Sequence, residues 1–399
     1  MERVPVISNE GYPLMPTKPS RARRWLKSGR AIIWKNNLQA FAIQLTTPSA
    51  GVESQKVVVG IDPGKLYTGI AVQSAKCTHW LGHIFLPFQK VKQRMEQRAM
   101  MRRSRRGRRI NRKLSYSKRS HRQARFDNRR LGKIPPSIRA NRDLEKRVLN
   151  ELENVFPLYE VIIEEVKARG NKGFSPVMVA QKWQLTRIGK EYRLTTVEGW
   201  KTSQIRKQLG LVKQKTSKAD AVISTHAVDG IALASSVFIE YSITSLKSRT
   251  WVGQVDITPC PLTVIRRPPI SRRQLHLMSY SKGSVRRKYG GTVTRHGYRK
   301  GDFVEATLGS KTIRGWVSGD TKNQVSVSDA NWKRIGQFSV RKTNLLKRSC
   351  GLIVNHNAGL SFLLHLPITG RSGSPARRNN EQAKIETQLS SFGRLLNQL

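Results

Sequence analysis

Cysteine and long apolar runs are scarce in this sequence of 399 residues. The three cysteines, Cys77, Cys260 and Cys350, lie far apart and form no CxxC pair. This spacing excludes a cysteine-based zinc knuckle and a disulfide framework, and it fits a reducing cytoplasm. No apolar run reaches the roughly 18 residues that a membrane-spanning helix needs, and the charged N-terminus lacks a signal-peptide pattern. We therefore expect a cytoplasmic protein with no membrane partner.

Acidic residues are also few, which leaves a large positive charge. The chain has 74 Lys and Arg against 25 Asp and Glu, a formal net charge of +49 and a pI near 11.3. Because a free globular protein gains nothing from such self-repulsion, we expect a polyanionic partner, namely nucleic acid. The length favours two or three compact units, and a hydrophobic content of 38% is adequate for their cores.

Basic residues concentrate in the segment 90–130. There, 18 of 41 residues are Lys or Arg, only Glu96 and Asp127 oppose them, and no proline interrupts the run. Since Arg, Lys, Gln and Met are good helix formers, we predict one long arginine-rich helix that continues into a second. A disordered run of charge is the alternative.

Apolar periodicity predicts the other elements. Strands are expected over 31–34, 41–45, 57–62, 67–72 and 161–164, and helices over 21–28, 141–156 and 219–238. Short strands over 252–257, 301–307, 312–318 and 325–327 predict a small β-barrel. The last thirty or so residues are polar and are expected to form a loosely held tail.

Three carboxylates stand out because each ends or interrupts a strongly apolar segment. Asp62 and Glu164 follow β-branched runs, and Asp229 lies in the small-residue segment 219–238. A carboxylate in such a position is costly unless a cation compensates it, so a converging set would hold one or two Mg²⁺ ions. His226 precedes Asp229 by three residues, and on a helix both face the same way. His226 is therefore placed to transfer a proton or to position water.

Each of these residues also has an ordinary structural interpretation. Asp62 precedes Pro-Gly and would suit a turn, while Glu164 stands beside Glu165 and would suit a strand end that meets solvent. Asp229 would suit an ion pair with one of the many arginines, and His226 would suit a structural role. The order of the four residues, separated by the basic segment, favours a common site.

That order resembles the split RuvC nuclease of the transposon-encoded IscB and IsrB families. The resemblance rests on short motifs in a fixed order. They are Gly60–Gly64 for the first RuvC motif, Val161–Glu165 for the second, His226–Asp229 for the third, 90–130 for the bridge helix, Pro13–Pro16 for the tetrapeptide that names the N-terminal domain, and Gly199–Thr202 with Leu209–Leu211 for the approach to the third motif.

The resemblance implies roles for the four site residues. Asp62, Glu164 and Asp229 would be the carboxylates that bind two Mg²⁺ ions, and His226 would be the assisting histidine. Glu165 is the rival for the second position, and Glu164 matches the register of the family.

The interval between Glu164 and His226 separates the two families. IscB carries an HNH nuclease there, which needs histidines, but this interval contains neither histidine nor cysteine. The sequence is therefore similar to IsrB, which implies an RNA-guided nuclease that nicks the non-target strand of double-stranded DNA. Its expected partners are a large structured guide RNA from the same locus and target DNA with a short flanking motif. The resemblance implies a monomer in a cytoplasmic ribonucleoprotein that joins the nucleoid when on DNA.

The fold class implied is α/β, an RNase H-like RuvC core split by an arginine-rich bridge helix, with a small N-terminal module and a C-terminal β-barrel-like domain. The domains expected are the N-terminal module (1–55), RuvC part I (56–88), the bridge helix (89–134), RuvC parts II and III (135–240), the β domain that contacts the target-adjacent motif (241–368) and the polar tail (369–399).

Arginines of the bridge helix and the β domain are the expected nucleic-acid contacts, because the guanidinium fork matches phosphate. They are Arg94, Arg98, Arg102, Arg103, Arg105, Arg106, Arg108, Arg109, Arg112, Arg266, Arg267, Arg286 and Arg287. Trp316 and Trp332 would stack on bases or fill the core. Two other functions remain open: an unguided, structure-selective RuvC-type endonuclease and a non-catalytic RNA-binding protein of a mobile element.

Overall fold

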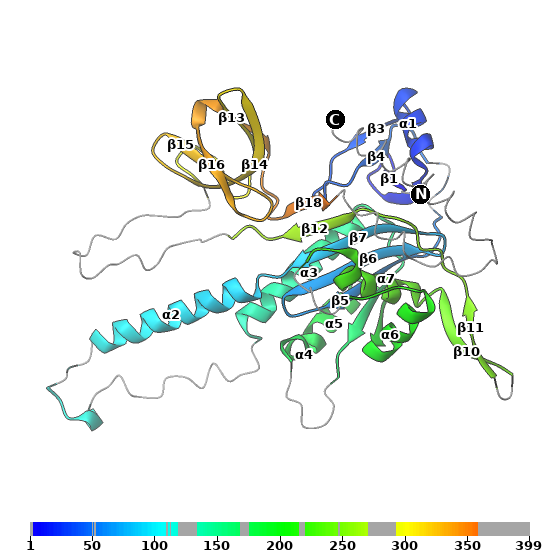
Figure 1. Cartoon of the computed structure of the whole chain (residues 1–399), viewed down its shortest axis with the longest axis horizontal. Helices are drawn as coiled ribbons and strands as arrows, with labels where there is room; N and C mark the ends of the chain where they lie inside the picture. The colour runs from blue at the N-terminus through cyan, green and yellow to red at the C-terminus, as the bar shows by residue number, and fades with distance from the viewer. Residues whose placement is uncertain are drawn as a thin grey trace. The chain divides into compact units, whose positions relative to one another are not determined.

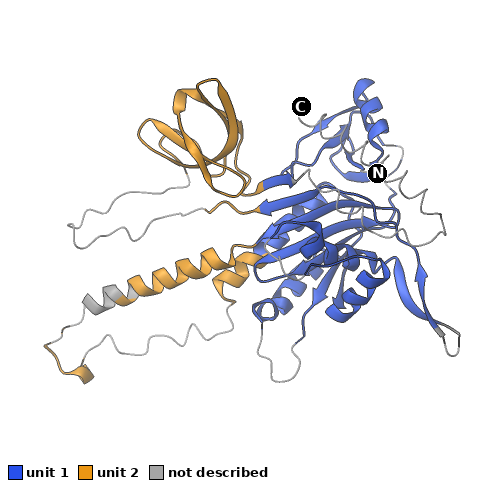
Figure 2. Cartoon of the chain, in the orientation of Figure 1, with its two compact units in different colours: residues 1–85, 143–265, 354–399 blue, residues 86–142, 266–353 orange. Residues whose placement is uncertain are grey.

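The structure is a computed structural model that describes residues 3–49, 51, 53–108, 111, 113–118, 134–167, 175–214, 220–245, 248–269 and 293–357. The chain divides into two compact units (Figure 2). One lies within residues 1–85, 143–265 and 354–399, and the other within 86–142 and 266–353. Both contain strands, and the fold is mixed α/β. Among the described helices, none is long and apolar enough to cross a membrane.

The N-terminal segment of the first unit forms a four-stranded sheet with one helix. The elements are β1 (Val4–Ile7), β2 (Pro13–Thr17), α1 (Pro19–Lys27), β3 (Ala31–Trp34) and β4 (Ala42–Leu45), with the strand order β2-β1-β4-β3. Val4, Val6, Ala22, Ala31 and Ile43 form its core. The helix and the two strands expected between residues 21 and 45 are confirmed to within a few residues at each end.

A seven-stranded sheet carries the rest of the first unit (Figure 1). Its strands are β5 (Val57–Pro63), β6 (Tyr67–Ser74), β7 (Cys77–Phe85), β8 (Glu160–Glu165), β9 (Leu194–Glu198), β12 (Leu262–Arg266) and β18 (Ile353–Asn357), in the order β18-β12-β7-β6-β5-β8-β9. β6 pairs antiparallel with β5 and β7, whereas β8 pairs parallel with β5 and β9. The β-branched runs of β5 and β8 are buried, as expected of central strands.

Helices flank these strands along the chain. They are α3 (Pro136–Glu153), α4 (Pro176–Val179), α5 (Gln181–Gly189), α6 (Gly199–Gln208), a π-helical turn η4 (Ile223–Ala227) and α7 (Val228–Ser235). α7 packs on β5 and β6, where Val58 and Leu233 share one apolar cluster. We expected a single helix over 219–238. The structure instead has the π turn η4 followed by α7, and α7 ends at Ser235.

A hairpin of β10 (Ile239–Ser245) and β11 (Ser248–Gly253) follows α7. The strand expected over 252–257 is therefore wrong beyond Gly253. Residues 254–261 belong to no described strand, and the Asp256 N–H donates to the Ala75 carbonyl instead of to a ladder partner. The prolines at 259 and 261 lack the N–H that a longer ladder needs.

The second unit contains α2 (Phe88–Arg108), a short turn η1 (Tyr116–Lys118) and a five-stranded antiparallel sheet. The strands are β13 (Phe303–Leu308), β14 (Lys311–Asp320), β15 (Gln324–Ser328), β16 (Arg334–Ser339) and β17 (Thr343–Lys347), with η6 (Val340–Lys342) between the last two. Their order is β16-β15-β14-β13-β17. No pairing joins β16 to β17 among the described strands, so the expected barrel does not close.

Two expectations fall partly outside the described residues. The arginine-rich helix is present as α2, but residues 119–133, where a second helix is expected, are not described. The same holds for the polar tail at 369–399. Trp316 is 8% exposed and packs on Phe303, so it belongs to the core of the five-stranded sheet.

Candidate functional site

Asp62 and Glu164 lie at corresponding positions of two neighbouring strands. β5 and β8 run parallel and pair through Ile61 and Ile163, and the two carboxylates follow directly on each strand. Alternate residues of a strand share one face. Val58 and Ile162 pack with Leu233 of α7, so Asp62 and Glu164 project from the face that α7 covers.

α7 brings Asp229 to the same face because glycines let the backbones touch. A Cβ on Gly60 would lie 2.1 Å from the Gly230 carbonyl oxygen, and a Cβ on Gly69 would lie 1.9 Å from the His226 carbonyl oxygen. Only glycine permits such an approach. Asp229 is the second residue of α7 and is buried, at 2% exposure. The glycine contacts therefore place it beside the ends of β5 and β8.

The three carboxylates act on one another electrostatically. Burial and the charges of Asp62 and Asp229 together raise the pKa of Glu164 to about 7, although a hydrogen bond from Thr202 opposes the shift. Burial and the charge of Asp62 also raise the pKa of Asp229. A group of buried carboxylates that repel one another in this way has a high affinity for cations.

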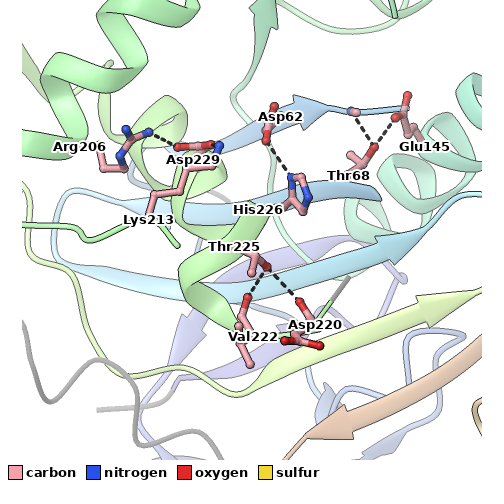
Figure 3. A network of polar contacts seen from close by, with 11 residues as sticks. Asp62, Thr68, Glu145, Arg206, Lys213, Asp220, Val222, Thr225, His226 and Asp229 are labelled. Atoms are coloured by element: carbon pink, nitrogen blue, oxygen red, sulfur yellow. Dashed lines mark hydrogen bonds and ion pairs between the residues drawn. The ribbon is translucent and has the colours of Figure 1, made fainter. Parts of the chain in front are cut away.

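Two basic side chains form ion pairs with the carboxylate of Asp229. Arg206 Nη1 lies 2.5 Å from Asp229 Oδ1, and Lys213 Nζ donates to Oδ2 (Figure 3). The ion-pair interpretation of Asp229 is therefore what the structure displays. No three His, Cys, Asp or Glu side chains of the described residues stand close enough to hold one metal ion. The three carboxylates lie on one face of the sheet and interact electrostatically. In the described structure they are not close enough together to bind one metal ion jointly.

His226 contacts Asp62 from the π turn that precedes α7. Its Nδ1 lies 3.3 Å from Asp62 Oδ2 (Figure 3), and both side chains are nearly buried, at 12% and 13% exposure. Its ring packs beside Tyr67 and His83, with centroids 5.7 and 5.6 Å away. The buried Nε2 has no hydrogen-bond partner among the described residues. This geometry orients the imidazole through Asp62 and leaves Nε2 without a hydrogen bond among the described residues.

Glu165 lies on the other face of β8. Its Oε2 is 3.8 Å from Lys167 Nζ, and its side chain is 29% exposed. Because side chains alternate along a strand, Glu164 and Glu165 lie on opposite faces of β8. Of the two, Glu164 is the one whose pKa is raised by the charge of Asp62.

The expected nucleic-acid contacts are only partly described. α2 carries the positions of Arg94, Arg98, Arg102, Arg103, Arg105, Arg106 and Arg108, and Arg98 and Arg103 are exposed. Arg266 ends β12 and Arg267 is exposed, whereas Arg109, Arg112, Arg286 and Arg287 lie outside the described residues. Burial and the charges of Arg266 and Arg94 lower the pKa of Lys90. Positive charge is therefore dense at the start of α2.

Comparisons with known proteins bear on the first half of the chain. Residues 4–175 match the RRXRR protein family. The matched span includes Asp62, Glu164 and α2, in which residues 102–106 are Arg-Arg-Ser-Arg-Arg.

Among solved structures, the chain is similar to T. thermophilus RuvC in complex with Holliday junction substrate. The two are 15% identical with a TM-score of 0.25, and the similarity covers 45% of this chain and 90% of that chain. No curated protein matches the chain.

Sequence analysis missed four residues that shape the site. Arg206 and Lys213 lie in a region otherwise rich in basic residues, so nothing in the sequence marks them as partners of Asp229. Tyr67 and His83 are placed beside His226 by the pairing of β6 with β7. β7 was not among the expected strands, so the position of His83 was not expected either.

Proposed function

We propose that this chain is an RNA-guided DNA endonuclease of the RuvC type that nicks the non-target strand of double-stranded DNA. The observation that carries the proposal is the convergence of Asp62, Glu164, Asp229 and His226 on the α7 face of β5 and β8. The site belongs to a chain with a net charge of +49, which suits a nucleic-acid substrate.

The sheet supports a RuvC-type core. β7, β6 and β5 pair antiparallel, whereas β5, β8 and β9 pair parallel, and this mixed sheet is compatible with the α/β core that the resemblance implies. In this arrangement the ends of the two central strands β5 and β8 carry Asp62 and Glu164. The expected catalytic carboxylates thus come from adjacent strands of one sheet.

The donors fit Mg²⁺ in chemistry. Asp62, Glu164 and Asp229 offer the hard oxygen ligands that Mg²⁺ prefers, and burial together with neighbouring carboxylate charge raises the pKa of Glu164 and of Asp229. Bound there, Mg²⁺ would supply activation of water and stabilisation of the departing phosphodiester oxygen. His226 holds its ring against Asp62 and takes or gives a proton at Nε2.

Guided recognition is supported by two features outside the site. α2 is an arginine-rich helix that follows β5, β6 and β7, and β5 carries the first motif. Between β8 and η4, the described residues form α4, α5, β9 and α6, and β9 extends the same sheet. This interval, which has neither histidine nor cysteine, favours a single nuclease site and hence one nicked strand.

One observation favours a non-catalytic alternative. Arg206 and Lys213 neutralise Asp229, as they would in a decayed site that only binds RNA. A nuclease requires both cations to give way when a metal ion binds. An unguided, structure-selective RuvC-type endonuclease is the other candidate, and the nature of the bound RNA separates it from the guided enzyme.

The test begins with co-expression of the chain and its native flanking DNA. The RNA that stays bound to the purified protein is sequenced, and nicking of a matching duplex is measured with and without Mg²⁺. We expect one abundant RNA with a variable end, and nicking that requires Mg²⁺. A heterogeneous mixture of cellular RNA would overturn guided recognition, and absence of nicking would overturn the enzyme.

Matched variants test the site itself. Asp62→Ala is expected to abolish nicking while RNA and target binding stay largely intact, because the carboxylate acts only in the chemistry. Glu165→Ala, on the other face of β8, is the control and should nick at close to the wild-type rate. If Asp62→Ala nicked DNA at the wild-type rate, the assignment of the site would be wrong.

A further inference from the structure

A basic pocket lies beside α1, within the N-terminal four-stranded module. It has a volume of about 370 Å³ and is lined by Arg21, Arg24, Trp25, Ser28 and Arg30. Its size suits a small organic group such as one nucleotide unit. The pocket is built from a single helix and the turn that follows it.

Helical spacing brings the pocket residues together. Arg21 and Trp25, like Arg24 and Ser28, are four residues apart and therefore share a face of α1. The helix ends at Lys27, and Gly29 turns the chain with a φ of +70°, a conformation that glycine adopts without strain. This turn returns Arg30 to the edge of the pocket.

The charge of the pocket is uncompensated. Three of its five lining residues are arginines and none is acidic. All three are exposed, and none forms an ion pair with a carboxylate in the described part of the chain. Guanidinium groups clustered without carboxylates are the usual recognition device for phosphate.

Trp25 gives the pocket an aromatic wall. It is partly buried and packs on the apolar core of the module. Arg21 lies over its ring, with the guanidinium carbon 5.9 Å from the ring centroid. The core holds one side of the ring, and an unpaired base would stack on the other side when the mobile end of Arg21 turns from the ring to the phosphate.

We propose that this pocket binds one unpaired nucleotide of RNA, with the base on Trp25 and its phosphate between Arg21, Arg24 and Arg30. The proposal deepens the proposed function, on which it rests for the presence of a bound RNA, and assigns that RNA a contact outside the nuclease site. Double-stranded nucleic acid does not suit the pocket, because paired bases do not present a free face to an isolated ring.

The test compares two double variants of the same helix. Arg21→Gln with Arg24→Gln removes charge from the pocket, whereas Arg23→Gln with Lys27→Gln removes equal charge from exposed residues that do not line it. Affinity is measured by fluorescence anisotropy with the full chain and a labelled single-stranded RNA of about twelve nucleotides. Circular dichroism checks that each variant folds.

We expect the pocket pair to lose about tenfold more affinity for the RNA than the control pair. Trp25→Leu, which keeps an apolar group on the core, should lose a similar amount. Equal losses in both pairs would overturn the pocket. Equal affinity of the wild type for single-stranded DNA of the same sequence would overturn the preference for RNA.

The two proposals fail separately. Binding is measured in the Asp62→Ala background and without Mg²⁺, so it requires no cleavage. If the pocket pair loses more RNA affinity than the control pair but the wild type does not nick DNA, the pocket proposal holds and the nuclease proposal is wrong. If the wild type nicks DNA but the two pairs bind RNA equally, the nuclease proposal holds and the pocket proposal is wrong.

Discussion

At the scale of single residues, the main feature of the candidate site is the burial of carboxylates close to one another. Glu164 holds its proton more tightly in the folded chain than in water, because burial and two neighbouring carboxylates disfavour its ionised form. Such a group opposes folding when it is ionised, and in the proposed nuclease a bound cation would relieve the same electrostatic cost.

The first prediction concerns Glu164 and pH. Its pKa rises from 4.5 to about 7 on folding, so the protonated group contributes stability that is fully present below pH 4.5 and is lost as pH rises through about 7. Without Mg²⁺, Glu164→Gln should therefore melt about 2–4 °C above the wild type at pH 8, and the difference should vanish near pH 4.5. Melting temperatures in a chelator across this range test it, and parallel curves would contradict it.

The second prediction concerns Lys213, which neutralises Asp229. Removing this charge makes the site more negative, so Lys213→Met should lower the Mg²⁺ concentration for half-maximal nicking by roughly threefold to tenfold. The nicking rate is titrated with Mg²⁺ at constant ionic strength. Lys207→Met, an exposed change on α6, serves as the control. A higher Mg²⁺ requirement would show that Lys213 assists the reaction instead.

At the scale of elements, the site depends on how closely α7 approaches β5 and β6. Gly60 and Gly230 put backbone against backbone, and Gly69 accommodates the π turn that carries His226. A π turn is an uncommon feature that often occurs at functional sites. Here it sets the angle from which His226 reaches Asp62.

The third prediction tests this contact. A Cβ at position 60 would lie 2.1 Å from the Gly230 carbonyl oxygen and 2.5 Å from the Ala234 nitrogen, backbone atoms that cannot move aside. Gly60→Ala should therefore destabilise the protein by about 2–4 kcal/mol and abolish nicking. Thermal melting and yield of soluble protein provide the measurement. Gly319→Ala, where a Cβ meets nothing within 4 Å, is the control, and equal melting of the two would contradict the prediction.

At the scale of the whole molecule, the net charge of +49 predicts a strong dependence of nucleic-acid affinity on salt. Described basic residues on α1 and α2 are largely exposed and face few carboxylates. Contacts of this kind release counterions from the phosphate backbone when they form.

The fourth prediction follows from that charge. RNA affinity should fall by on the order of 10³-fold or more between 50 and 200 mM salt, because several phosphates are bound at once. Filter binding at constant Mg²⁺ measures the slope of the logarithm of affinity against that of salt. The Arg21→Gln with Arg24→Gln pair should make the slope shallower by about one unit or less for each phosphate that the variant no longer neutralises, and the Arg23→Gln with Lys27→Gln pair should change the slope less. A flat response of the wild type would contradict the prediction.

Features that depend on local pattern can be predicted from the residues alone. β-branched runs predicted β5 and β8 and placed Asp62 and Glu164 at their ends, because burial of a strand is written in its own residues. Basic helix formers predicted α2, and composition predicted a nucleic-acid partner. The domain boundaries and the roles of the site residues stay predictions.

Which side chains contact one another depends on the folded arrangement and could not be predicted from local pattern. Strand pairing turned Glu164 toward Asp62 and Glu165 away, and the glycine contacts brought α7 close enough for Asp229 to share their field. The ion pairs of Asp229 with Arg206 and Lys213 join residues 23 and 16 positions apart. In a chain this basic, every carboxylate has many possible partners, and only distance in the folded chain selects among them.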